Sequence, residues 1–224
     1  MILPKTKIEE DCLGRGQYVI GIDEAGRGPL AGPVVASAVL IFPETISAEV
    51  DFDRELIRDS KTLSEKQRDE IYEHINNNPN LFQIGVGEVS HLMIDKVNIL
   101  NATFLAMRLA VDELLTKIFQ DEKLSKIINR ENLCLLVDGN RKIPKINLEQ
   151  KVFAKGDRDF FSIAAASICA KVRRDRMMRK FHEEFPEYCL DQHKGYGTKL
   201  HYEKIKKFGP CRIHRRSFNL GLES

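Results

Sequence analysis

The chain has 224 residues, of which 42% are hydrophobic and 30% are charged, and its formal net charge is +2. This composition is typical of a globular protein with one sizeable core, and it excludes an intrinsically disordered chain. No apolar run reaches the roughly 20 residues of a membrane span, and residues 1–11 lack the apolar stretch of a signal peptide. We therefore expect a cytoplasmic protein that does not associate with membranes.

Short apolar runs that end in polar or glycine-rich breaks predict the strands of the fold. Residues 18–22 and 133–137 are compact apolar runs, and residues 34–42 are rich in Val, Ala and Leu. Residues 81–89 alternate apolar residues with polar residues or glycine, and residues 152–154 predict a further short strand.

Helices are expected between and after these strands. Ser64 and Gln67 form a capping box for a helix that runs to about residue 75. Apolar residues at spacings of three and four predict a long amphipathic helix over residues 100–118. Residues 162–181 and 201–208 predict two more helices, so the class is α/β with a helical C-terminal part.

Positive charge is concentrated near the C-terminus. Residues 171–216 contain 14 Lys and Arg but only 6 Asp and Glu, a net charge of +8, so the remainder of the chain is acidic. Such asymmetry fits a surface that binds a polyanion, but it equally fits a solvated helical surface, and charge alone favours neither.

Four acids fall where strands are expected to end: Asp23, Glu24, Asp138 and Asp157. A single acid at a strand end is usually a turn former or a helix cap, but four such positions favour a cleft at one edge of the sheet. Clustered carboxylates repel one another unless a cation is present, and Mg²⁺ and Mn²⁺ prefer oxygen ligands. Two such ions about 3.5–4 Å apart can assist an in-line phosphoryl displacement.

Asp23 and Glu24 are adjacent, and neighbours in a strand point to opposite faces of the sheet. We therefore expect the strand to end or bulge at these residues, and the Gly-Arg-Gly-Pro segment at 26–29 makes such a break plausible. Its glycines would let the backbone approach a ligand closely, and Arg27 suits a phosphate. Taken alone, this segment is more often a plain turn.

Seven segments of the sequence resemble, in the same order, the characteristic blocks of the ribonuclease HII family. They are Gly21–Val34, Asp59–Ser64, Ile94–Thr103, Val137–Gly139, Lys155–Ser167, His193–Thr198 and His214–Phe218. Several of these blocks would be weak signals alone, but chance recurrence of the whole ordered set is negligible.

The resemblance implies an RNase H-like α/β fold, with a mixed five-stranded sheet flanked by helices and a small helical C-terminal extension. It divides the chain into an N-terminal extension (1–17), a catalytic domain (18–182) and a helical substrate-binding part (183–224). It implies an endoribonuclease that hydrolyses the RNA strand of RNA–DNA hybrids by a two-metal mechanism. Cleavage 5′ of single ribonucleotides in duplex DNA would leave 3′-hydroxyl and 5′-phosphate ends and would serve ribonucleotide removal from DNA.

The resemblance also assigns the site. It gives the four acids a catalytic role as ligands of two Mn²⁺ or Mg²⁺ ions; Asp159 and Asp175 compete with Asp157 for the fourth position, but the spacing to Ser162 favours Asp157. It implies that the ribonucleotide is sensed by main-chain contacts of one loop, that an aromatic ring stacks on the following sugar, and that two further residues contact phosphates. These substrate-binding residues are Gly26, Arg27 and Gly28, then Tyr196, then Ser60 and Lys61.

Physical chemistry agrees, because only the 2′-hydroxyl distinguishes RNA from DNA at a given position, and an aromatic ring binds without sequence preference. One alternative is a related nuclease that requires longer RNA tracts. Another is a hybrid-binding module without activity, which would require the loss of at least one acid. We expect a monomer.

Overall fold

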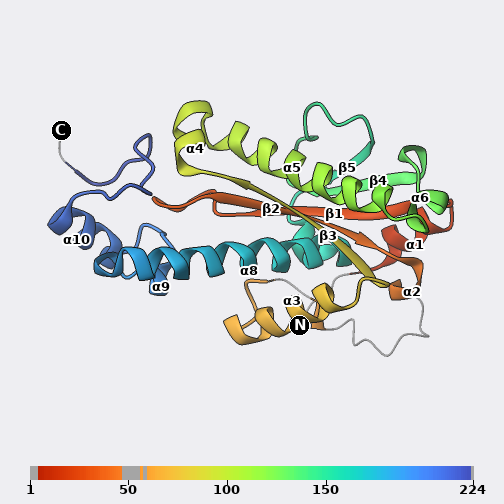
Figure 1. Ribbon diagram of the computed structural model, residues 1–224, viewed down its shortest axis with the longest axis horizontal. Helices are drawn as coiled ribbons and strands as arrows, with labels where there is room; N and C mark the ends of the chain where they lie inside the picture. The colour runs from red at the N-terminus through yellow and green to blue at the C-terminus, as the bar shows by residue number, and fades with distance from the viewer. Residues whose placement is uncertain (1–4, 47–55, 58–59, 223–224) are drawn as a thin grey trace.

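The structure is a computed structural model that describes residues 5–46, 56–57 and 60–222. A five-stranded sheet in the order β3-β2-β1-β4-β5 forms its centre (Figure 1). Strand β2 pairs antiparallel with both β1 and β3, whereas β4 pairs in parallel with β1, and β5 pairs in parallel with β4. The strands are β1 (Tyr18–Ala25), β2 (Val34–Ile41), β3 (Phe82–Val89), β4 (Leu133–Asp138) and β5 (Glu149–Phe153).

Two long helices cover the two faces of this sheet (Figure 1). Helix α5 packs on β2 and β3, and α8 packs on β1 and β2. Close approach requires glycine at Gly21, because a Cβ there would overlap the backbone of Ser162 at the start of α8. The helices are α1 (Lys7–Leu13), α2 (Pro43–Ile46), α3 (Glu65–Asn77), α4 (His91–Val97), α5 (Ile99–Gln120), α6 (Leu124–Ile127), α7 (Gly156–Asp159), α8 (Phe161–Glu184), α9 (Leu190–His193) and α10 (Lys199–Phe208).

The chain beyond α8 forms a small helical part with its own apolar cluster, at the end of α8 that carries α9 and α10 (Figure 1). Residues of this cluster include Leu30 and Ala31 from the loop between β1 and β2, together with Leu190, Ile205 and Ile213 from the C-terminal part. Burial of these side chains attaches the C-terminal part to that loop.

The predicted α/β class and the mixed five-stranded sheet are confirmed, and the capping box of Ser64 and Gln67 is present. The prediction that β1 ends or bulges at Asp23 and Glu24 is wrong. Strand β1 continues regularly to Ala25, where it still pairs with β2. Its pairing with β4, however, stops at Ile22, so the side of β1 beyond that point is open.

Candidate active site

A cavity of about 320 Å³ lies at the open side of β1. All ten residues that the sequence singled out line this cavity, although they come from five separate stretches of the chain. They are Asp23, Glu24, Gly26, Arg27, Gly28, Ser60, Lys61, Asp138, Asp157 and Tyr196.

The four acids reach the cavity from three elements. Asp23 and Glu24 belong to β1, Asp138 is the last residue of β4, and Asp157 lies in the short helix α7. Because β1 and β4 are parallel neighbours, their carboxyl ends meet at the same edge of the sheet. Asp23 and Asp157 are buried, with exposed fractions of 5% and 4%.

Three of these carboxyl groups have raised pKa values. Burial is the main cause for Asp23, and the neighbouring charges of Glu24 and Asp138 raise its pKa further. Burial also raises the pKa of Glu24 and of Asp138, although Arg27 opposes the shift at Glu24 and the Gly156 amide opposes it at Asp138. The protein alone therefore leaves the negative charge of this cluster poorly stabilised, which favours the binding of cations.

The acids that lie nearest to basic side chains pair with them. Lys61 Nζ lies 2.5 Å from Asp157 Oδ2, and Arg27 Nη1 lies 3.3 Å from Glu24 Oε1. In the part of the chain that the structure describes, no three acidic, histidine or cysteine side chains already form a metal cage. The cavity therefore gathers the four acids, and two of them, Glu24 and Asp157, pair with basic side chains.

Ser60 and Lys61 line the cavity from the segment before α3. The hydroxyls of Ser60 and Ser167 are 3.0 Å apart, and Arg68 Nη1 donates to the Ser60 carbonyl at 2.9 Å. These contacts fix the segment against α8 and α3. Asp59, which begins the matching sequence block, lies outside the described residues.

The Gly26–Gly28 loop and Tyr196 are neighbours at one end of the cavity. A Cβ on Gly28 would lie 3.8 Å from Tyr196 Cε1, and the ring of Tyr196 is 42% exposed. The amide of Leu30 donates to the Gly195 carbonyl at 2.8 Å, which links the two loops directly. Lys171 Nζ and Arg174 Cζ each lie 5.8 Å from the centroid of the Tyr196 ring.

The sequence matches a family model described as Ribonuclease HII over residues 20–220. The chain belongs to the ribonuclease HII family. A ribonuclease HII from Caldicellulosiruptor saccharolyticus is 44% identical over 213 residues, which cover 95% of this chain and 92% of the relative. Membership makes the protein a ribonuclease H, an endonuclease that hydrolyses phosphodiester bonds of nucleic acid, and metal dependence is typical of the family.

Solved structures agree with the fold. Ribonuclease H2 from Pyrococcus horikoshii matches with a TM-score of 0.65 and 24% identity over 91% of this chain and 95% of that chain. Bst-RNase HIII in complex with Mn²⁺ matches with a TM-score of 0.67 and 16% identity over 92% of this chain and 68% of that chain. At these identities the likeness establishes a shared RNase H fold alone.

Four further polar residues at this cavity were missed from the sequence: Arg68, Ser167, Lys171 and Arg174. Ser167, Lys171 and Arg174 lie on one face of α8, where Ser167 and Lys171 line the cavity and Arg174 lies behind the Gly26–Gly28 loop. Their spacing of four and then three residues is the helical signal that could have identified them. Ser167 also hydrogen-bonds to Asp23, which lowers the pKa of that carboxyl against the effect of burial.

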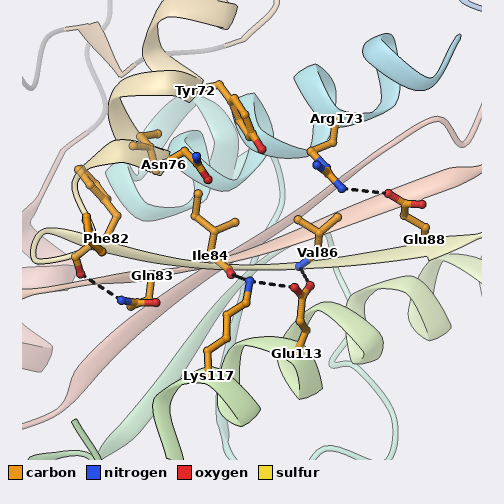
Figure 2. Close-up of a pocket in the computed structure, with 12 residues that line it drawn as sticks. Tyr72, Asn76, Phe82, Gln83, Ile84, Val86, Glu88, Glu113, Lys117 and Arg173 are labelled. Atoms are coloured by element: carbon orange, nitrogen blue, oxygen red, sulfur yellow. Dashed lines mark hydrogen bonds and ion pairs between the residues drawn. The ribbon is translucent and has the colours of Figure 1, made fainter. Parts of the chain in front are cut away.

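A second cavity of about 350 Å³ lies along the outer edge of β3, between α3, α5 and α8. Figure 2 shows that Lys117 and Glu113 of α5 reach over this edge. Lys117 Nζ donates to the Ile84 carbonyl at 2.8 Å, and the Val86 amide donates to Glu113 Oε2 at 2.5 Å. These side chains therefore form hydrogen bonds with backbone groups that would otherwise pair with another strand.

Among the residues that the structure describes, no helix has both the length and the apolar character of a membrane span.

Proposed function

We propose that this ribonuclease HII cleaves the RNA strand of RNA–DNA hybrids and also cuts 5′ of a single ribonucleotide in duplex DNA. The products would carry 3′-hydroxyl and 5′-phosphate ends, as removal of ribonucleotides from DNA requires. One observation carries the proposal: four acids share a cavity of about 320 Å³ with a glycine-rich loop and an exposed tyrosine. Such a cavity combines a site for phosphodiester hydrolysis with a surface that can sense a ribose.

Two divalent cations, Mg²⁺ or Mn²⁺, are the proposed cofactors. Their ligands would be the carboxylates of Asp23, Glu24, Asp138 and Asp157, which supply the hard oxygen donors that both ions prefer. The raised pKa values of Asp23, Glu24 and Asp138 support this fit, because a bound cation would stabilise their ionised forms. When bound, such ions activate water and stabilise a departing oxygen. A related fold, Bst-RNase HIII, has been solved with Mn²⁺.

The Gly26–Gly28 loop is the proposed sensor of the 2′-hydroxyl, which it would contact through main-chain groups of Gly26, Arg27 and Gly28. A 2′-hydroxyl both donates and accepts, so backbone groups can detect it without reading the base. Tyr196 would stack on the sugar that follows the ribonucleotide. The exposure of its ring and its position beside Gly28 support this role.

Ser60 and Lys61 are the proposed phosphate contacts. Both line the cavity, and the side chain of Lys61 is 76% exposed, so it can reach a bound nucleic-acid backbone. In this arrangement residues 18–182 form the catalytic domain, residues 183–224 the substrate-binding part and residues 1–17 an N-terminal extension. Support for the C-terminal assignment comes from Tyr196 and from the apolar cluster that attaches this part to the sensor loop.

One cleavage assay tests the proposal. The purified protein is given a duplex with one ribonucleotide, a hybrid with an all-RNA strand and an all-DNA duplex, each with Mg²⁺, with Mn²⁺ and with excess chelator. We expect metal-dependent cleavage of the first two duplexes and none of the third. Cleavage of the all-RNA strand alone would instead favour a nuclease that requires longer RNA tracts, and binding without cleavage would favour a binding module.

A further inference from the structure

Two arginines are completely buried behind the sensor loop, and neither forms an ion pair with any residue that the structure describes. Arg174 and Arg215 both have an exposed fraction of 0%. A buried cation without an acidic partner is destabilising unless its donors are satisfied otherwise. Both guanidinium groups instead donate to backbone carbonyls of the loop between β1 and β2 and its surroundings.

Arg215 alone of these two donates to the sensor loop itself. Its Nη2 lies 2.6 Å from the Gly26 carbonyl oxygen and its Nη1 lies 2.9 Å from the Arg27 carbonyl oxygen. Its remaining bonds, to Gly32 at 3.0 Å and to Pro33 at 3.2 Å, fix the guanidinium plane against the far end of the same loop. Arg174 contacts the carbonyls of Ala31, Pro33 and Lys194 instead.

The bonds from Arg215 determine where two amide hydrogens of the loop point. No described peptide bond is cis, and in a planar trans peptide the N–H points opposite to the C=O. Because the carbonyls of Gly26 and Arg27 face Arg215, the amides of Arg27 and Gly28 face away from it, on the side where these residues line the cavity. Within the described residues, neither amide donates to a protein acceptor, so both remain available to a ligand oxygen.

We propose that Arg215 is a positioning residue for ribose recognition, because it turns the Arg27 and Gly28 amides toward the cavity. This inference rests on the proposed function, in which the Gly26–Gly28 loop detects the 2′-hydroxyl. A lysine cannot replace Arg215, since only the planar guanidinium offers a fork of donors at fixed angles to several carbonyls. Burial lowers the pKa of Arg215 to about 9, so it is still charged at neutral pH.

Binding measurements with the full chain test the proposal. Fluorescence anisotropy in excess chelator gives Kd for two duplexes that differ only in one 2′-hydroxyl, and their ratio is the ribose preference. We expect Arg215→Lys to reduce this preference about tenfold, as the loss of a well-oriented hydrogen bond implies. Ile118→Ala is the control: it removes a fully buried side chain of α5 that does not line the cavity and should lower Tm, yet it should keep the preference of the unmodified protein.

The results distinguish a positioning role of Arg215 from a general structural role and from failure of the proposed function. An unchanged preference in Arg215→Lys overturns the proposal, and so does an equal loss of preference in both variants, which would indicate a general structural role. If the unmodified protein itself shows no preference, the proposed function fails, and the role of Arg215 fails with it.

A measurement on the unmodified protein covers the case in which Arg215→Lys does not fold. The Nε–H resonance of Arg215 should shift when the ribonucleotide duplex is added and stay in place with the all-DNA duplex. An equal response to both duplexes overturns the proposal.

Discussion

Lys61 Nζ lies 2.5 Å from Asp157 Oδ2, so a flexible lysine pairs with one of the proposed metal ligands. The carboxylate is buried while the lysine side chain is 76% exposed, which leaves Lys61 able to move away when a cation or a phosphate enters. The ion pair therefore competes with metal binding at Asp157 and is compatible with the proposed phosphate contact.

Substitution of Lys61 should separate these two roles. Lys61→Met is expected to bind Mn²⁺ a few-fold more tightly in the absence of duplex, because the competing ammonium is removed, while duplex affinity falls. Isothermal titration calorimetry with Mn²⁺ and with duplex measures both effects. Weaker Mn²⁺ binding in Lys61→Met would contradict the competition.

Asp138 should be essential for turnover rather than for binding. Asp138→Asn removes a charged ligand at the edge where β1 and β4 meet, so we expect kcat to fall about a hundredfold or more. Its affinity for the hybrid should stay largely intact. Asp159→Asn is the control, because the Asp159 side chain is partly exposed and pairs with Arg158, and neither residue lines the cavity. Full activity in Asp138→Asn, or an equal loss in Asp159→Asn, would refute the assignment.

Tyr196 should matter more for cleavage than for folding. Tyr196→Ala is expected to lower kcat/KM at a single ribonucleotide about tenfold or more, as the loss of one stacking contact implies, with a small change in Tm. Tyr202→Ala is a matched control, because Tyr202 is exposed to a similar degree, 37% against 42%, but does not line the cavity. A large fall in Tm with unchanged cleavage would instead indicate that Tyr196 is structural.

A chain of hydrogen bonds behind Tyr196 should make stability depend on pH. His201 Nδ1 lies 3.0 Å from the Tyr196 carbonyl, and His201 Nε2 lies 3.1 Å from His214 Nε2. Cys211 Sγ lies 3.1 Å from His214 Nδ1. Since a carbonyl only accepts, Nδ1 of His201 donates to it. Burial keeps both imidazoles neutral at neutral pH, so Nε2 of His201 accepts from His214, which accepts in turn from the Cys211 thiol.

Burial lowers the pKa of His201 and of His214 to about 4. In the unfolded chain a histidine titrates near 6.5, so between pH 6.5 and 4 the unfolded state binds more protons and stability falls as the pH falls. One such group loses about 2 kcal/mol between pH 6.5 and 5. Denaturant unfolding at several pH values measures this. His214→Gln should flatten the dependence; an unchanged slope in this variant would contradict the assignment.

The outer edge of β3 should pair with other copies of the protein when the two side chains that cover it are removed. The double variant Glu113→Ala and Lys117→Ala frees the Val86 amide and the Ile84 carbonyl shown in Figure 2, so we expect self-association that grows with concentration. Analytical ultracentrifugation compares it with Lys66→Ala and Glu70→Ala, an exposed pair of the same spacing on α3. Equal sedimentation of the two double variants would show that the edge is protected by other means.

Local sequence signals predicted the elements of the fold well, because each depends on neighbours along the chain. The capping box of Ser64 formed as expected, and the apolar face predicted over residues 100–118 lies within α5. The expected break in β1 failed for a tertiary reason. Continued pairing of β1 with β2 keeps Asp23 and Glu24 in a regular strand, and only the end of the β4 pairing opens the cavity beside them.

The sequence by itself determined which side chains are candidates for the chemistry: the ordered blocks identified ten of the residues that line the cavity. Only the tertiary structure decided how those residues are oriented. The guanidinium of Arg215 meets the carbonyl of Gly26 across 189 positions of the chain. No local pattern encodes that contact, because the burial of a charge and the direction of a peptide group are set by packing between segments that are distant in sequence.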